Sequence, residues 1–224
     1  MTETNSIQLE SLRKSYGRKT IFDQLDLKLS PGLYFVKGEN GTGKSTLLKL
    51  IAGVEAPDSG LVSIYGNSVA RQRLSTNLKR TFVPDQPVFF DYCRAEEIFS
   101  LFSSLYGLDS LAQSIQIQTW DLVEIWMQSW RTLSLGQKKR VFLAGLLLSQ
   151  VPIWTLDEPT NALDSRFRQV LIQQIEMQII SGHTVILSSH DLVPEDFVSI
   201  GARTHVLRLE AFQGVTRVNS ELLG

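Results

Sequence analysis

Residues 38–45 read Gly38-Glu39-Asn40-Gly41-Thr42-Gly43-Lys44-Ser45, and this octapeptide governs how the rest of the chain is interpreted. It matches the phosphate-binding pattern G-x-x-x-x-G-K-[ST], which is informative when a strand precedes it and a helix follows it. The mostly apolar run at 33–37 predicts that strand, and a helix is predicted from Lys44 onward. The bare pattern is expected by chance in about 1% of chains of this length, so nucleotide phosphate binding is strongly favoured.

The chemistry of this loop follows from its backbone and its last side chains. Glycines let several N–H groups turn toward bound phosphates, and the helix that follows adds its positive end. Lys44 supplies a point charge for the β- and γ-phosphates, and the hydroxyl of Ser45 suits Mg²⁺. The residues expected to contact the nucleotide are Gly38, Glu39, Asn40, Gly41, Thr42, Gly43, Lys44, Ser45 and Thr46.

A second polar signal follows the mostly apolar run at 151–156, which leads into Asp157 and Glu158. Taken alone, such a run is more often a strand that ends in a solvated turn. Two adjacent carboxylates at the end of a buried strand, however, repel each other unless a cation or a proton lies between them. Together with the loop upstream, they favour Asp157 as a Mg²⁺ ligand and Glu158 as the base that polarises the attacking water.

The composition limits the class of protein. The chain has 224 residues, of which 43% are hydrophobic and 20% charged, and its net charge is −1. These values suit one α/β domain with a sizeable core, and they give no sign of the basic face of a nucleic-acid binder. The one cysteine, Cys93, can form no internal disulfide, which fits a reducing cytosol.

No targeting or membrane-spanning segment is expected. Residues 1–10 are polar and lack the apolar region of a signal peptide. The most apolar run, at 141–148, has eight residues, whereas a helix needs about 20 to span a bilayer. A role in transport would therefore require separate membrane subunits.

Hydrophobic periodicity divides the chain into three stretches. In the first, which covers residues 7 to about 66, residues 21–29 alternate as in a half-buried strand. The middle stretch, about 91–131, is mostly helical, with helical spacing over 96–106. The last stretch alternates helix and strand, which predicts an α/β fold with a mainly parallel sheet covered on both faces. Its expected elements are helices at 135–149 and 165–181 and strands at 153–156, 184–187 and, as the final strand, 205–209.

Five further features stand in order around these two motifs. They are Tyr16 before Gly17, Phe-Val-Pro-Asp-Gln at 82–86, Leu-Ser-Leu-Gly-Gln at 133–137, Asn-Ala-Leu-Asp at 161–164 and Ser-His-Asp at 189–191. In this order they resemble the motifs of ABC ATPases, and the resemblance covers nearly the whole chain. The last four resemble the Q-loop with Gln86, the LSGGQ signature, the D-loop and the switch histidine, His190.

The signature segment departs from the family pattern at Leu135, which replaces the first glycine of LSGGQ. Ser134 and Gln137 also form a capping box, which by itself would only start a helix. The two interpretations agree, because a helix N-terminus with a serine hydroxyl and a glycine backbone is an anion site. The resemblance implies that Ser134, Gly136 and Gln137 bind the γ-phosphate held by the opposite subunit.

The remaining candidates each have a purely structural alternative. A lone histidine such as His190 is usually a surface or hydrogen-bonded core residue, and Gln86 alone carries little information. The ring of Tyr16, near a strand edge, could simply pack. The resemblance implies instead that His190 contacts the γ-phosphate, that Gln86 contacts Mg²⁺ and that Tyr16 stacks on adenine.

Aromatic residues in and near the helical stretch leave two interpretations open. Trp120, Trp126 and Trp130 could form the core of this region or a docking surface for a membrane subunit, and we favour the core. In the family, a groove beside the Q-loop receives the membrane subunit. The better docking candidates are therefore the aromatic residues just after the predicted Q-loop, Phe89, Phe90 and Tyr92.

The resemblance also implies the organisation of the protein. It predicts one ABC ATPase domain over residues 1–224, with a P-loop NTPase core at 1–86 and 132–224 and a helical subdomain at about 87–131. The core would include an N-terminal antiparallel β region. Two copies, most simply a homodimer, would meet head to tail with ATP and Mg²⁺ between them. The implied catalytic residues are Lys44, Gln86, Glu158 and His190, and the implied metal ligands are Ser45, Gln86 and Asp157.

The favoured function is the ATP-hydrolysing subunit of an ABC transporter. Such a subunit would lie on the cytoplasmic face of the inner or plasma membrane through its permease partners. Residues 105–108, Leu-Tyr-Gly-Leu, resemble small exporter cassettes of the drug, lipid and haem types, which favours export. One alternative is a soluble ABC ATPase acting on a ribosome or nucleic acid, although such members usually carry two cassettes or a long coiled coil. Another is a non-ABC NTPase such as a P-loop kinase, against which the motifs at 133–137 and 189–191 argue.

Overall fold

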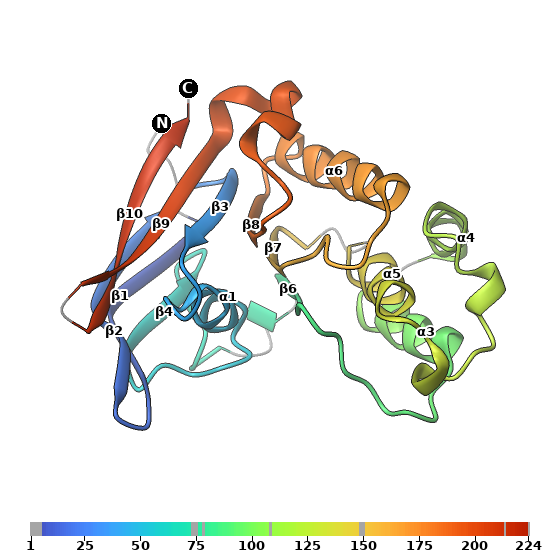
Figure 1. Ribbon diagram of the computed structural model, residues 1–224, viewed down its shortest axis with the longest axis horizontal. Helices are drawn as coiled ribbons and strands as arrows, with labels where there is room; N and C mark the ends of the chain where they lie inside the picture. Colours follow the sequence, from blue (N-terminus) through green and yellow to red (C-terminus); the bar gives the residue numbers. More distant parts are fainter. Residues whose placement is uncertain are drawn as a thin grey trace.

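The computed structural model describes residues 6–72, 76–77, 79–107, 109–147, 151–212 and 214–223 (Figure 1). The strands are β1 (Ile7–Tyr16), β2 (Lys19–Leu29), β3 (Leu33–Gly38), β4 (Ser59–Ile64), β5 (Asn67–Ser68), β6 (Arg80–Val83), β7 (Ile153–Asp157), β8 (Thr184–Ser188), β9 (Thr204–Phe212) and β10 (Val215–Leu223). The α-helices are α1 (Lys44–Ala52), α3 (Ala95–Leu105), α4 (Ser110–Thr119), α5 (Leu135–Leu146) and α6 (Ser165–Ile180). The 3-10 segments are η1 (Val123–Ile125), η2 (Trp130–Thr132) and η3 (Pro194–Arg203).

In the part of the chain that the structure describes, the larger sheet has six strands in the order β10-β9-β3-β8-β7-β6. Its neighbouring strands run parallel except β9 and β10, so the predicted mainly parallel α/β sheet is confirmed. The predicted helices and strands of the last stretch are present with shifted ends, and the expected helix end at Ser149 lies outside the described residues.

The prediction that 205–209 is the final strand is wrong, because β10 follows it. This strand pairs antiparallel with β9 along its whole length, from Val215 opposite Phe212 to Leu223 opposite Thr204. Among the described residues, strand β10 lies at the edge of the sheet and pairs with β9. Most of its nine residues are polar, which weakens the alternation by which strands are recognised in a sequence.

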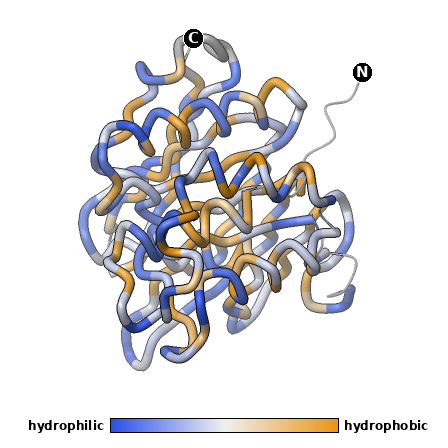
Figure 2. Tube along the Cα trace, turned by 90° about the vertical axis from the view of Figure 1, so that its right-hand side faces the viewer, coloured by the Kyte–Doolittle hydropathy of each residue, from blue (hydrophilic) through white to orange (hydrophobic). Residues whose placement is uncertain are grey.

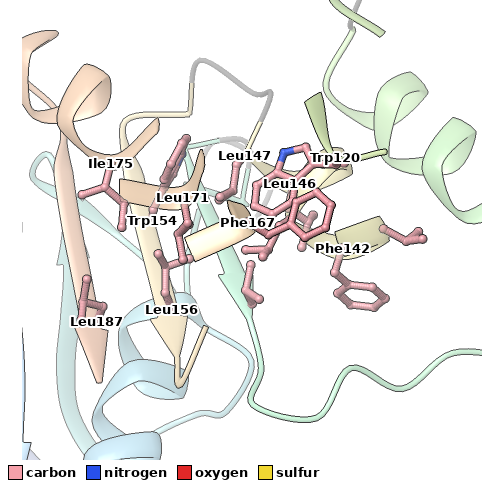
Figure 3. Close-up of a cluster of buried hydrophobic side chains, with 14 of the residues drawn as sticks. Trp120, Phe142, Leu146, Leu147, Trp154, Leu156, Phe167, Leu171, Ile175 and Leu187 are labelled. Atoms are coloured by element: carbon pink, nitrogen blue, oxygen red, sulfur yellow. The ribbon is translucent and has the colours of Figure 1, made fainter. Parts of the chain in front are cut away.

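Helices cover both faces of the larger sheet. Successive strand residues point to opposite faces, so Phe35 and Trp154 pack with Leu171 of α6, whereas Val36 and Ile153 pack against α1. Part of the α6 side of this core is drawn in Figure 3. Burying one leucine side chain completely stabilises the folded state by about 1.5–3 kcal/mol. The two clusters therefore hold the strands of the larger sheet in place.

The N-terminal region forms a separate sheet of four antiparallel strands in the order β2-β1-β4-β5. Its apolar face, which includes Ile7 and Phe22, joins the same buried cluster as Leu47 and Leu48 of α1. Helix α1 therefore packs against both sheets within one buried cluster (Figure 1).

Helices α3 and α4 lie at the far side of the molecule from the N-terminal sheet, next to α5 (Figure 1). Trp120 and Trp130 are buried there, and the Trp120 ring stacks on Phe167 of α6 with ring centres 6.0 Å apart (Figure 3). Trp126 packs against the same core and meets Phe99. The interpretation of these tryptophans as core residues is confirmed.

Hydrophobic and hydrophilic residues are interspersed along most of the chain (Figure 2). Among the described residues, no helix combines the length and the apolar character needed to cross a membrane. Leu108, the last residue of the segment that resembles exporter cassettes, lies outside the described residues.

Candidate functional site

The parallel strands β3, β7 and β8 end at a pocket of about 590 Å³. This is the place where open α/β sheets bind their ligands. The predicted site residues in its lining are Tyr16, Asn40, Gly41, Gly43, Lys44, Ser45, Thr46, Asp157, Glu158 and His190. The other lining residues are Lys19, Ile21, Asp85 and Asn161, which the sequence interpretation did not place in the site. We call this cavity the phosphate pocket.

The loop between β3 and α1 requires glycine at two points. Gly41 and Gly43 have φ values of 80° and 99°, a left-handed region that side chains disfavour. A Cβ atom on Gly43 would also lie 2.5 Å from the side chain of Ile21. Helix α1 begins at Lys44, directly after Gly43, so its unpaired N–H groups face the pocket as an anion site.

Three predicted contact residues shape this loop from behind. Gly38, Glu39 and Thr42 line a second cavity, on the side of β9. Lys44 Nζ donates to the carbonyl groups of Gly38, at 2.8 Å, and Glu39, at 3.1 Å, and Thr42 Oγ1 donates to Glu39. Thr216 of β10 donates its hydroxyl proton to the Thr42 carbonyl at 2.8 Å. The C-terminal hairpin therefore braces the phosphate loop.

The carboxylate pair stands at the end of β7. Asp157 is 5% exposed and accepts a hydrogen bond of 2.6 Å from the hydroxyl of Ser188, the last residue of β8. Glu158 leaves the strand conformation with a φ of 45°, and its N–H donates to the Ser188 carbonyl at 3.1 Å. Ser188 was not predicted, although it directly precedes the segment of the switch histidine. It fixes both acidic residues at once.

Glu158 and His190 lie side by side in the phosphate pocket. One Glu158 oxygen lies 3.4 Å from His190 Nε2, and the other accepts a hydrogen bond from the His190 backbone N–H at 3.2 Å. The Glu158 side chain is 13% exposed, whereas that of His190 is 68% exposed. The carboxylate is thus sheltered and oriented, and the imidazole reaches into solvent at the mouth of the pocket.

The structure places Asp85, the neighbour of Gln86, in the phosphate pocket. Among the described residues, the lining of the phosphate pocket includes Asp85 but not Gln86, which is exposed. The Asp85 carboxylate accepts a hydrogen bond of 2.8 Å from the side chain of Asn161 and lies 3.5 Å from the Lys139 ammonium. A loop has no periodicity from which to decide which of two neighbouring polar residues turns inward. The partners of Asp85 are also distant in the sequence.

The donor set of the pocket fits a magnesium ion. Ser45 offers a hydroxyl, and Asp157 and Asp85 offer carboxylate oxygens in the same cavity. Hard oxygen ligands of this kind, completed by water and phosphate oxygens, are those that Mg²⁺ prefers. Lys44 lies beside them with a positive charge for the phosphates.

Tyr16 lies at the open side of the pocket and is 45% exposed. Its hydroxyl donates to the carboxylate of Glu55, and the Thr46 hydroxyl donates to the Tyr16 oxygen at 3.5 Å. Partial burial and the neighbouring Glu55 raise the pKa of the Tyr16 phenol, so the ring stays neutral at physiological pH. The Lys14 ammonium lies 5.1 Å from the ring centre. A tethered, half-exposed ring suits stacking on a nucleobase.

The signature residues form a different cavity, at the start of α5. Ser134 accepts a hydrogen bond from the Gln137 N–H at 3.2 Å, and the Gln137 side chain accepts one from the Ser134 N–H at 2.8 Å. The predicted capping box is therefore present. A Cβ atom on Gly136 would lie 2.4 Å from the Ala162 carbonyl oxygen, so that position needs glycine. We call this cavity, which Arg140, Asp164 and Phe167 also line, the signature pocket.

Within the part of the chain that the structure describes, Ser134, Gly136 and Gln137 do not line the phosphate pocket. The Ser134 hydroxyl accepts from the backbone and keeps its own proton for another acceptor. Leu135, the departure from the family pattern, is 39% exposed at the same helix end. The signature pocket thus presents amide and hydroxyl donors outward.

Two named proteins are similar to this chain over most of its length. The linearmycin resistance ATP-binding protein LnrL of Bacillus subtilis (strain 168) is 27% identical over 86% of this chain, which spans 63% of the length of LnrL. The cytochrome c biogenesis ATP-binding export protein CcmA of Mannheimia succiniciproducens is 28% identical, and the match covers 89% of this chain and 94% of CcmA.

The fold also matches that of a solved ATP-binding cassette, which is dimeric in a post-hydrolysis state with ADP and Pi. The TM-score is 0.80 at 23% identity, over 97% of this chain and 99% of the other. The family described as ABC transporter matches residues 22–161, more than half of the chain, and this match runs from β2 through the phosphate loop to the residues after Glu158. The chain therefore belongs to the ABC transporter family and has the fold of its ATP-binding domains.

Proposed function

We propose that the chain binds and hydrolyses ATP as the nucleotide-binding subunit of a transporter and works as a head-to-tail homodimer. The observation that carries the proposal is the meeting of Lys44, Asp157, Glu158 and His190 in one pocket at the strand ends. These residues combine the charges that hold a triphosphate with a sheltered carboxylate that can accept a proton.

Each residue has a defined task in this proposal. The amides of the phosphate loop and the Lys44 ammonium bind the β- and γ-phosphates. Ser45, Asp157 and Asp85 would hold Mg²⁺, which neutralises charge on the phosphates when bound. Glu158 accepts a proton from the attacking water, and His190 orients the Glu158 carboxylate from the pocket mouth. Tyr16 stacks on the base.

The separation of the two pockets supports a dimer. Ser134 and the N-terminal amides of α5 are suited to a γ-phosphate, but the signature pocket is built apart from the phosphate pocket. A second copy placed head to tail brings one pocket of each kind together. An ATP-binding cassette with the same fold is itself a dimer. Hydrolysis would then depend on closure, because closure completes the site.

The Glu158→Gln variant tests the hydrolytic role. The amide keeps the shape of the side chain but cannot accept the proton, so turnover should fall about 100-fold or more while ATP affinity stays within a few-fold. Phosphate release and binding of a fluorescent ATP analogue measure the two quantities. Glu176→Gln, on α6, is the matched control and should leave both unchanged. Turnover near that of the unmodified protein would refute Glu158 as the base.

The surface beside the phosphate pocket supports a membrane partner. Of the predicted docking residues, Phe90 and Tyr92 are 64% and 77% exposed, whereas Phe89 packs against the buried core. Val88, which was not predicted, is 80% exposed beside them. The rings of Phe90 and Tyr92 stack with centres 5.7 Å apart, which makes a compact apolar anchor of the kind that interfaces use. Binding here would attach the chain to the cytoplasmic side of a permease. Export is the favoured direction, because CcmA is named as an export protein.

Copurification from detergent-solubilised membranes tests this attachment. The tagged chain should retain a multi-span membrane protein, and the double variant Phe90→Ser/Tyr92→Ser should lose it without losing basal ATPase activity. Leu111→Ser on α4 is the control, because Leu111 is an equally exposed apolar residue outside the anchor, at 70%. Equal retention by both variants would remove the aromatic anchor from the proposal, and ATPase activity stimulated by nucleic acid would favour the soluble alternative.

A further inference from the structure

Lys139, in the second turn of α5, is completely buried, at 0% exposure. Lysine is almost never buried to this extent unless its charge is paired. The residue follows the signature segment by two positions, yet its side chain points away from the signature pocket, toward the loops at the ends of β6 and β7. Burying a charged group costs desolvation free energy, which the groups that contact it must offset.

The Lys139 ammonium joins two loops of the phosphate pocket. It donates a hydrogen bond to the backbone carbonyl of Glu158, and it lies 3.5 Å from the Asp85 carboxylate. Asn161 donates to the same carboxylate oxygen at 2.8 Å. One buried cation therefore connects the loop after β6, the turn after β7 and helix α5.

The turn at Glu158 needs such support. Glu158 is a non-glycine residue with a φ of 45°, a conformation that persists where surrounding contacts enforce it. Its N–H is held by Ser188 and its carbonyl group by Lys139, so both ends of its backbone are fixed. The direction of the carboxylate then follows from the backbone, before any contact with His190.

The charges around Lys139 also support a role in holding these loops together. Burial lowers the pKa of Lys139, and the nearby carboxylates of Asp85, Glu158 and Asp157 oppose that shift. A neutral side chain at this position would remove the buried positive charge that lies close to all three acidic groups. Met, which has a similar length, would fill the space without replacing the hydrogen bond or the charge.

We propose that Lys139 is a positioning residue for hydrolysis, whose buried ammonium holds the Glu158 turn and the Asp85 carboxylate in place within the phosphate pocket. The proposal rests on the hydrolytic function proposed above. Because Lys139 belongs to the helix that starts at the signature pocket, it also ties the catalytic carboxylate of one site to the surface that serves the opposite subunit.

The test compares Lys139→Met with Lys139→Gln in the full chain. Lys139→Met should lower kcat about 10-fold or more while the Kd for a fluorescent ATP analogue changes less than about 3-fold. Lys139→Gln retains a donor for the Glu158 carbonyl and should recover part of kcat. Circular dichroism and thermal unfolding, each with and without Mg·ATP, establish that the variants are folded. Where Lys139→Met does not fold, Lys139→Gln is compared directly with the unmodified protein and should show the lower kcat.

A double-mutant cycle separates positioning from general damage. Single-turnover hydrolysis should be no slower in Lys139→Met/Glu158→Gln than in Glu158→Gln alone, because Lys139 acts through Glu158. Multiplied losses, full turnover in Lys139→Met, or an equal rise in the Kd of every Lys139 variant would each overturn the proposal. An active Glu158→Gln variant would instead overturn the hydrolytic role itself, so the two failures are distinct.

Discussion

The phosphate pocket and the signature pocket are built in different ways. The first draws side chains from segments as distant as Tyr16 and His190, and its chemistry comes from charged groups and carboxylates. The second is made by the start of α5 and residues that follow Glu158, and it combines a hydroxyl and backbone amides with the charged side chains of Arg140 and Asp164. The comparison teaches that the charges that hold and react with ATP are gathered within one chain. The donors that would close over the γ-phosphate face away, toward a neighbour.

The largest expected effect is the recovery of ATP turnover when two inactive variants, one altered in each pocket, are mixed. Lys44→Ala removes the phosphate charge and should abolish measurable ATP binding. Ser134→Ala should preserve binding but lower turnover about 100-fold, as the loss of one transition-state donor does. Mixed dimers then contain one site with both Lys44 and Ser134 intact. Turnover should reappear on mixing, measured as phosphate release against the total concentration of the two variants.

The control must separate the hydroxyl of Ser134 from its capping role. Loss of the cap alone costs about 1 kcal/mol of stability for Ala but only a few tenths for Gly, so Ser134→Gly should be as inactive as Ser134→Ala yet more stable. Ser134→Thr, which keeps a hydroxyl, should retain turnover. If the mixture stays inactive while each variant is folded, the two pockets do not meet across subunits.

The difference between the pockets also explains which site residues could be predicted from the sequence. The phosphate loop and the start of α5 are local: the residues that shape them lie within a few positions, so the pattern of residues predicts both directly. Asp85 is different. It turns inward because Lys139 and Asn161, which lie 54 and 76 positions away, hold its carboxylate, and no local pattern distinguishes it from Gln86.

The fold divides in a similar manner. Strands β3, β7 and β8 are buried on both sides and appear in the sequence as short apolar runs. Strand β10 is polar and exists because β9 offers it an edge, so it could be recognised only from the tertiary structure. The Ser188 contacts to Asp157 and Glu158 likewise depend on the β7–β8 register, in which Asp157 lies opposite Ser188. Sequence patterns predict where the strands lie, whereas the register between strands determines which side chains at their ends form hydrogen bonds.

The smallest expected effect concerns Tyr16, which lies at the end of the phosphate pocket where we place the nucleobase. Tyr16→Ala should raise the KM for ATP about 3- to 10-fold, because an aromatic contact contributes about 0.5–1.5 kcal/mol. Its kcat should stay unchanged, since the groups that contact the Glu158 carboxylate come from His190 and do not include the ring. Tyr16→Phe keeps the ring and loses only the hydrogen bond to Glu55, so its KM should remain within about 2-fold of the unmodified protein. Steady-state kinetics with ATP measures both. A Phe variant as impaired as the Ala variant would mean that the link to Glu55, and not stacking, is what the pocket needs from Tyr16. A lowered kcat would instead connect this end of the phosphate pocket to the closure that the signature pocket completes.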